Sequence, residues 1–126
     1  MTLREAYRRT TYRAGDLAVR PGFHSRDGDA WLASLPAREA AFITAWNPMS
    51  RRHAPGWNAR QQERLRAWLR RYPTLEGMSG FNAWQEHNLL VAADTRLLIR
   101  AAQRFRQAAI LVLRRSQPAR LLYKYR

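Results

Sequence analysis

The sequence predicts an α+β fold, with a single mixed sheet of five or six strands and two main helices packed on it. Two amphipathic stretches predict the helices, and several short apolar runs separated by turn residues predict the strands. At 126 residues, the chain has the length of one domain that buries a core without metals or disulfides. We therefore expect residues 1–126 to form a single domain.

The chain is expected to begin with a short helix and a hairpin. Thr2 and Glu5 have the spacing of a capping box, which predicts a helix through about Arg8. Residues 10–13 and 17–20 alternate in polarity around a Gly-Asp pair, so we expect them to be the two strands of a hairpin.

A brief helix and a strand are expected next. Asp29 is predicted to cap a helix over residues 30–35, which the following proline ends. Residues 40–46 are apolar and contain strand-forming residues, which predicts a strand that ends at Asn47.

The two main helices are predicted from caps that precede apolar residues at helical spacing. Asn58, with Gln61 as its capping-box partner, is expected to begin a helix that runs to residue 72. Asp94 is expected to cap a second helix that ends near residue 105. The residues expected to face the core are Leu65, Trp68, Leu69 and Tyr72 in the first helix, and Leu98, Ala101, Ala102 and Phe105 in the second.

The remaining segments complete the predicted sheet. Residues 74–85 contain glycine and asparagine, so we expect a loop with a short strand at residues 78–81. Strands are also expected at residues 88–93, 109–114 and 120–125.

The charge of the chain favours an anionic partner. The sequence has 23 basic and 9 acidic residues, a net charge of +14, and all but one of the basic residues are arginine. The planar guanidinium group matches phosphate well, so we expect a nucleic acid or another phosphate-bearing partner. A coding sequence rich in G and C would account for the lack of lysine but not for the shortage of acids.

Several arginines recur at helical spacing. Arg96, Arg100 and Arg104 are four residues apart and form one stripe on the second main helix, while Arg60 and Arg64 form a similar pair on the first. Each like-charged pair costs an isolated helix about 0.2–0.5 kcal/mol, and a bound polyanion would turn this repulsion into attraction. A solvated face screened by salt is the alternative interpretation.

Other classes of site and location have little support in the sequence. Cysteine is absent, which excludes disulfides, thiolate metal sites and cysteine nucleophiles. The three histidines lack the spacing of helical metal ligands and no glycine-rich phosphate loop is present, so we expect neither a metal nor a cofactor. Because the sequence has no signal-like segment and no run of membrane-spanning length, we expect a cytoplasmic protein without a membrane partner.

Short motifs spread over the chain resemble those of a known family. They are Ala6-Tyr7 with Thr10 and Tyr12, Thr44-Ala45-Trp46-Asn47-Pro48 with Ser50, Asn58, Glu86 before Leu89-Leu90-Val91, and Phe105-x-Gln107-x-Ala109. In their order and spacing, they make the sequence similar to domain-of-unknown-function family 3293, which comprises small bacterial and phage proteins. The resemblance implies a fold and the location of a site, but no activity.

The last of these motifs departs from the family pattern. That pattern resembles Phe-Gly-Gln-Asn-Ala, where this chain has Arg106 and Ala108. If the glycine closes a helix in a left-handed conformation, an arginine there costs about 1 kcal/mol, or the helix end is built differently.

The motifs and the polar end of the strand at residues 40–46 define a candidate ligand site. Its residues are Thr44, Trp46, Asn47, Ser50, Arg51, Asn58, Glu86 and Gln107. Amides and hydroxyls can orient a polar ligand, and Glu86 can accept or carry a proton. Turn and cap chemistry explains Asn47 and Asn58 equally well. We expect Trp46, Asn47, Asn58 and Glu86 to share one neighbourhood.

Three functions follow from these observations. The first is binding of a nucleic acid or another phosphate-bearing partner through an arginine-rich surface. The second is a small enzyme or small-molecule-binding protein with a polar pocket around Asn47, Asn58, Glu86 and Gln107. The third is a protein–protein module for an acidic partner. The sequence leaves open whether the protein is an enzyme and how it oligomerises.

Overall fold

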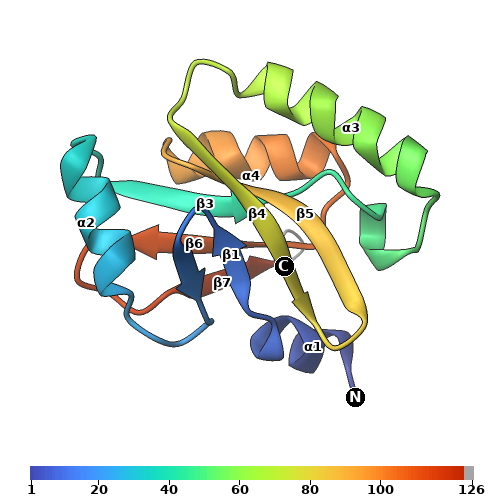
Figure 1. Ribbon diagram of the computed structural model, residues 1–126, viewed down its shortest axis with the longest axis horizontal. Helices are drawn as coiled ribbons and strands as arrows, with labels where there is room; N and C mark the ends of the chain where they lie inside the picture. Colours follow the sequence, from blue (N-terminus) through green and yellow to red (C-terminus); the bar gives the residue numbers. More distant parts are fainter. Residues whose placement is uncertain (124–126) are drawn as a thin grey trace.

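A central antiparallel sheet organises the computed structural model, which describes residues 1–123 (Figure 1). Its strand order is β4-β5-β3-β6-β7, and every pairing is antiparallel. The strands are β3 (Glu39–Ile43), β4 (Thr74–Phe81), β5 (Trp84–Val91), β6 (Ala109–Arg114) and β7 (Arg120–Tyr123). The α+β class is therefore confirmed, but the prediction of a mixed sheet is wrong.

Helices and a separate hairpin surround this sheet. The hairpin consists of β1 (Tyr12–Ala14) and β2 (Leu17–Val19), which form a second, two-stranded sheet. The helices are α1 (Leu3–Arg9), α2 (Arg26–Ser34), the short 3₁₀ helix η1 (Pro48–Ser50), α3 (Pro55–Trp68) and α4 (Thr95–Arg104). The expectation of one sheet with two main helices is thus too simple for the described residues.

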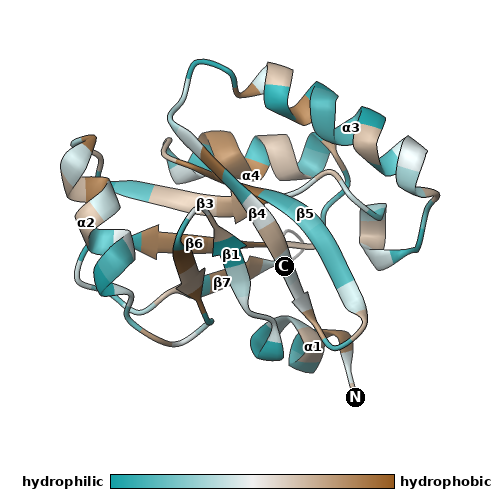
Figure 2. Ribbon diagram, in the orientation of Figure 1, coloured by the Kyte–Doolittle hydropathy of each residue, from teal (hydrophilic) through white to brown (hydrophobic). Residues whose placement is uncertain are grey.

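Strand β3 lies in the middle of the sheet and is buried on both sides. Ala41 and Ile43 face a core formed with α3 and α4, whereas Ala40 and Phe42 face a core formed with α2 and the hairpin. A strand covered on both faces reads as a continuous apolar run, which is why the sequence showed no alternation there. In Figure 2 the apolar residues gather on the middle strands and on α4, while much of α3 is hydrophilic.

The predicted inward faces of the two main helices are largely confirmed. Leu65, Leu69 and Leu98 are fully buried, and the apolar residues of α4 pack with them on the sheet. Trp68 was wrongly placed in the core, since it lies at the last residue of α3 and is 40% exposed. Tyr72 lies beyond the helix end and is partly buried against the same core.

Several boundaries differ from the sequence prediction because long-range contacts determine them. Helix α3 begins at Pro55, so Asn58 is a buried first-turn residue and Gln61 has no capping role. The cap of α2 is Ser25 rather than Asp29, whose carboxylate accepts a hydrogen bond from the Ser116 amide. The predicted strand at residues 120–125 ends at Tyr123 in the structure, and its last two residues lie outside the described part.

The segment expected to be a loop is instead the long strand β4. Gly77 lies where the hairpin crosses β4, and a Cβ atom there would come within 2.3 Å of the Arg13 carbonyl oxygen. Only glycine allows this close approach of two backbones. Among residues 1–123, no helix has both the length and the apolar character needed to cross a bilayer.

Candidate functional site

The segment that follows β3, residues 44–51, separates two cavities. Thr44, Asn47 and Ser50 line a small polar cavity, whereas Pro48 and Arg51 line a larger cleft. Three non-glycine residues of this segment have positive φ angles. These angles are 45° for Asn47, 54° for Met49 and 63° for Ser50. Each such residue costs about 1 kcal/mol or more, so the surrounding structure must hold the segment in place.

Asn58 supports the middle of this segment. Its Oδ1 accepts a hydrogen bond from the Asn47 amide at 3.0 Å, and its Nδ2 donates to the Asn47 Oδ1 at 2.9 Å. The Asn47 Oδ1 also accepts from the His53 amide at 2.8 Å. Because Asn58 lies in the first turn of α3 and is only 2% exposed, the helix fixes the position of the segment.

The C-terminal end of α4 holds the segment from the other side. The Arg106 carbonyl accepts a hydrogen bond from the Met49 amide at 2.8 Å, and the Gln107 Nε2 donates to the Trp46 carbonyl at 3.1 Å. The two sequence motifs that contain Trp46 and Gln107 therefore meet in space. Arg106 itself has a φ of 57°, so the position expected to be left-handed is left-handed.

The small cavity has a volume of about 70 Å³ and is lined mostly by polar side chains. Its lining includes Tyr7, Thr10, Tyr12, Thr44, Asn47, Ser50, Trp84, Glu86, Asn88 and Gln107. These residues come from α1, the hairpin, the segment after β3, strand β5 and the end of α4. Most of the polar residues on which the family resemblance rests thus line one cavity.

Glu86 is the acidic group of this cavity. Its Oε2 accepts hydrogen bonds from the Asn47 Nδ2 at 3.0 Å and from the Trp84 indole at 2.9 Å. Burial raises the pKa of the Glu86 carboxyl, while these two donors and the nearby Arg52 oppose the rise. The Arg52 guanidinium lies 4.4 Å from the centre of the Trp84 ring.

Two tyrosines add hydroxyl groups to the cavity. Burial raises the pKa of the Tyr12 hydroxyl, with Tyr7 and Glu86 adding to the effect, so this hydroxyl stays protonated. The Tyr7 and Ser50 hydroxyls share a hydrogen bond of 2.9 Å. The cavity therefore offers a carboxyl group, neutral hydroxyls and an amide within a small volume.

Replacing Glu86 with glutamine is expected to stabilise the protein at pH 7. Folding raises the pKa of this carboxyl, so the folded state binds the proton more tightly and its stability falls as the pH rises through the folded pKa. The glutamine side chain would keep an oxygen acceptor for Asn47 and Trp84 without the buried charge. The gain should shrink as the pH falls towards 4.5, the ordinary value for glutamate. Urea unfolding of both proteins at pH 7 and pH 5 measures this.

Asp16→Asn is the matched control, since Asp16 is an exposed carboxylate in the hairpin turn. A gain for Glu86→Gln that is independent of pH would contradict the prediction.

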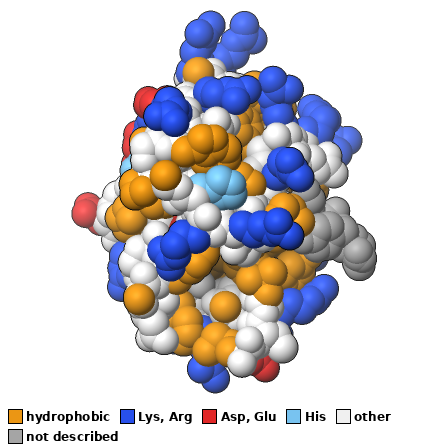
Figure 3. Space-filling model, turned by 90° about the vertical axis from the view of Figure 1, so that its right-hand side faces the viewer, with side chains coloured by type: hydrophobic (Ala, Val, Ile, Leu, Met, Phe, Trp, Pro, Cys, Tyr) orange, Lys and Arg blue, Asp and Glu red, His pale blue; other side chains and the backbone are white. Residues whose placement is uncertain are grey.

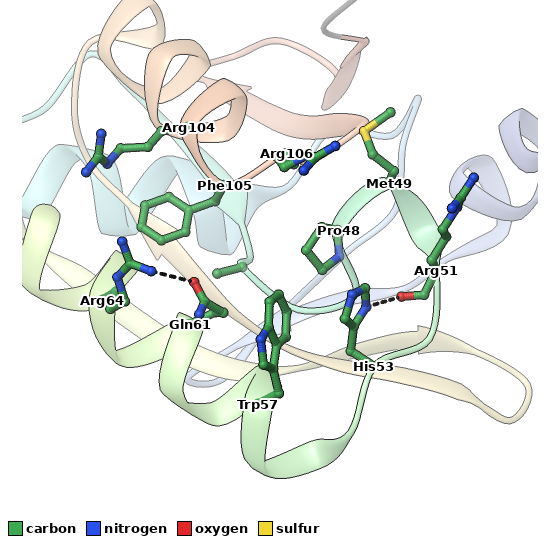
Figure 4. Close-up of a pocket in the computed structure, with 11 residues that line it drawn as sticks. Pro48, Met49, Arg51, His53, Trp57, Gln61, Arg64, Arg104, Phe105 and Arg106 are labelled. Carbon is green, nitrogen blue, oxygen red and sulfur yellow. Dashed lines mark hydrogen bonds between the residues drawn. The ribbon is translucent and has the colours of Figure 1, made fainter.

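The larger cleft has a volume of about 710 Å³ and lies between α3, α4 and the segment after β3 (Figure 4). Arg64 and Arg104 lie at one end, Arg51 lies at the other, and Arg106 lies between them beside Phe105 and Met49. Between these ends, apolar and aromatic side chains form the wall of the cleft. They are Ala45, Pro48, Met49, Trp57 and Phe105.

A stacked pair of rings gives this wall a fixed shape. The His53 and Trp57 rings lie 4.3 Å apart at an angle of 21°. The His53 Nδ1 also forms a 2.7 Å hydrogen bond with the Arg51 carbonyl oxygen (Figure 4). These contacts restrict the rotation of the Trp57 side chain.

The cleft has a strongly positive lining. No acidic residue lines it, and no carboxylate of residues 1–123 forms an ion pair with any of its four arginines. Arg64 donates a hydrogen bond to the neutral Gln61 side chain at 3.1 Å. On the molecular face in Figure 3, arginine side chains are spread among hydrophobic ones, and acidic side chains lie at the margins.

Only part of the predicted arginine surface reaches the cleft. Arg64 and Arg104, from the two predicted helical groups, come together there, whereas Arg60 and Arg100 do not line it. Arg96 forms an exposed ion pair of 3.1 Å with Asp94, the cap of its own helix, so a carboxylate already lies beside its charge. The stripe predicted from spacing alone is therefore not a uniform row of unpaired cations.

Six of the eight predicted ligand residues line one of the two cavities, whereas Trp46 and Asn58 line neither. The expected neighbourhood of Asn47, Asn58 and Glu86 exists, because Asn47 contacts both of the others directly. Thr44, Ser50 and Gln107 also line the small cavity, and Arg51 lines the cleft. The Trp46 carbonyl accepts a hydrogen bond from the Gln107 side chain. A ligand-binding role for these residues stays a prediction.

The sequence interpretation missed several residues of both cavities. In the small cavity these are Tyr7, Tyr12 and Trp84, and in the cleft they are His53, Trp57, Phe105 and Arg106. The two tyrosines already belonged to the motifs of the family resemblance, which was the available signal. Within residues 1–123, no group of three or more His, Asp and Glu side chains is arranged to hold a metal ion.

Comparison with known proteins gives one match. A family described as "Protein of unknown function (DUF3293)" matches residues 43–110, which include the end of β3, both main helices and the segment between the two cavities. No curated protein and no solved structure matches the chain significantly.

Proposed function

The family match covers more than half of the chain, so the chain belongs to the DUF3293 family, and we propose that it binds a nucleic acid or another phosphate-bearing partner in its larger cleft, which we call the arginine cleft. The observation that carries this proposal is the convergence of Arg51, Arg64, Arg104 and Arg106 on one cleft without any acidic lining residue. Arginine binds phosphate oxygens through a planar fork of donors, and such charge-assisted bonds are the strong ones.

The energetics of the cleft favour an anionic ligand. Four like charges that face one cleft repel one another, and the folded protein gains nothing from their proximity. A bound phosphate group removes this repulsion and satisfies the guanidinium donors at once. The net charge of +14 adds a long-range attraction that speeds the encounter with a polyanion at low salt.

The dimensions of the cleft support a ligand rather than a bare ion. Its volume of about 710 Å³ falls in the range of about 300–1,000 Å³ that is typical of small-molecule sites. The lining combines apolar walls with a few polar groups, as in most ligand pockets. The small cavity, at about 70 Å³, has room for only a few atoms.

Replacing Arg64 and Arg104 together with glutamine should weaken binding to nucleic acid at least about tenfold. Each phosphate contact contributes about 0.9 to the slope of log affinity against log salt on duplex and about 0.7 on single strands, so the slope should flatten by up to about two units. Fluorescence anisotropy with labelled DNA and RNA oligonucleotides at several salt concentrations measures both quantities.

The matched control removes the same charge elsewhere. Arg26 and Arg38 are exposed, and neither lines the cleft. Arg26→Gln with Arg38→Gln lowers the net charge equally, so it tests whether charge alone is sufficient. An equal loss of affinity in both double variants would contradict a role for the cleft. Binding of an acidic protein but not of phosphate ligands would favour the protein–protein alternative.

The small cavity supports a second candidate, a small-molecule-binding or enzymatic function. The specific observation is that Glu86 and the Tyr12 hydroxyl, with shifted pKa values, lie among residues from five separate segments. Such clusters are enriched at functional sites. A thermal-shift screen of small polar compounds tests it, with Tyr12→Phe as the variant that should abolish a positive shift. A screen in which the two proteins respond alike to every compound would reject this candidate.

A further inference from the structure

We infer that the arginine cleft accepts an unpaired base of a single-stranded nucleic acid, with the adjoining phosphates held by the arginines at its two ends. This inference rests on the proposed function and specifies its ligand. It draws on the aromatic wall, the concave shape of the cleft and the placement of the charges.

The aromatic wall is the first argument. Trp57 and Phe105 line the cleft between its two charged ends (Figure 4). Proteins that bind single strands without sequence preference stack bases on aromatic side chains beside a positively charged groove. The 4.3 Å stack with His53 holds the Trp57 ring in position before any ligand arrives, and a pre-ordered side chain loses less conformational freedom on binding.

The shape of the cleft is the second argument. The cleft is concave, so a ligand group must enter it, whereas proteins that read duplex DNA insert a protruding helix or ribbon into a groove. In a duplex the bases are paired and stacked inside, and the phosphates alone could reach the cleft. A single strand can turn a base inwards while its backbone stays outside.

The placement of the charges is the third argument. Arg64 and Arg104 lie at one end of the aromatic wall, Arg51 lies at the other, and Arg106 lies between them beside Phe105. A backbone that crosses the cleft would pass the Arg64 and Arg104 guanidinium groups on one side of the base and the Arg51 guanidinium on the other. Gln61 lies on the wall beside Arg64, where its amide can donate a hydrogen bond to the edge of a base.

The test compares three ligands of equal length on the wild-type protein. They are a single-stranded oligothymidylate, the same strand with abasic sites throughout, and a duplex, all at one salt concentration in fluorescence anisotropy. The single strand should bind about tenfold more tightly than the abasic strand, because stacking contributes substantially for each base. Equal affinity for the two strands, or tighter binding of the duplex, would overturn the inference.

Substitution of Trp57 separates stacking from phosphate contacts. Trp57→Leu should lose most of the preference for the base-containing strand, keep its affinity for the abasic strand and leave the salt slope unchanged. Trp57→Phe retains a ring and should recover part of the preference, which also guards against a folding defect in the leucine variant. Full preference in both folded variants would refute stacking on Trp57.

The outcomes also distinguish this inference from the proposal on which it rests. If all three ligands bind alike and the Arg64/Arg104 variant weakens all of them, phosphate binding stands and base recognition fails. If none of the ligands binds in a way that depends on the two arginines, the proposed function itself fails.

Discussion

Replacing Asn58 with alanine is expected to lower the free energy of unfolding by about 2–4 kcal/mol. The substitution leaves the buried Asn47 amide without its acceptor and removes the donor to the Asn47 side chain. Each buried polar group left unsatisfied costs about 1–3 kcal/mol. Urea unfolding followed by circular dichroism measures the loss.

A loss of stability in Asn58→Ala is informative because alanine is a better helix former than asparagine. At an exposed helical position, a change to alanine stabilises by up to about 0.7 kcal/mol. Gln103→Ala is the control, since Gln103 is an exposed amide residue in α4 and its change to alanine should leave stability unchanged or slightly raised. An Asn58→Ala variant as stable as wild type would show that the segment is held by other contacts.

Elements defined by local interactions could be predicted from the sequence. The Thr2–Glu5 capping box and the Asp94 cap are both present, because the groups that form them lie within three residues of each other. The inward faces of α3 and α4 also followed from residue spacing, since the helical period is a local property. Such features do not depend on the rest of the chain.

Features that depend on distant parts of the chain could not be predicted. In the sequence, Asn58 is typical of a helix cap. In the structure, the Asn58 side chain is buried and accepts a hydrogen bond from the Asn47 amide. The proline at position 55 was the better signal for the helix start, because the first helical position tolerates its missing N–H. Gly77 favours a loop in the sequence. In the structure it lies in a strand, which needs glycine there because the hairpin backbone passes too close for a Cβ atom.

The candidate site was also predictable only in part. Asn47 and Glu86 were expected to be neighbours because both border the ends of elements, and a 3.0 Å hydrogen bond joins them. The cleft was not foreseen, since Arg64 and Arg104 were assigned to separate helical stripes and Arg106 to a helix end. Only the packing of α3 beside α4 brings these three side chains into one lining.

Replacing Arg106 with glycine is expected to stabilise the protein by about 1 kcal/mol and, at the same time, to weaken binding to nucleic acid several-fold. Arg106 follows the cap of α4 with a φ of 57°, and the Arg106 and Gln107 amides bond back to the Gln103 and Ala102 carbonyls. This is the Schellman arrangement, in which glycine is the favoured residue because it lacks a Cβ. An arginine here costs stability and adds a guanidinium to the cleft.

Arg106→Ala is the matched variant for this prediction. Alanine removes the guanidinium but keeps the Cβ atom, so it should bind nucleic acid as weakly as the glycine variant without its gain in stability. Thermal unfolding and fluorescence anisotropy on the three proteins separate the two effects. If glycine and alanine gave equal stability, the left-handed conformation would carry no cost. If either variant kept wild-type affinity, the Arg106 guanidinium would have no part in binding, and the cost of an arginine at this helix end would need another explanation.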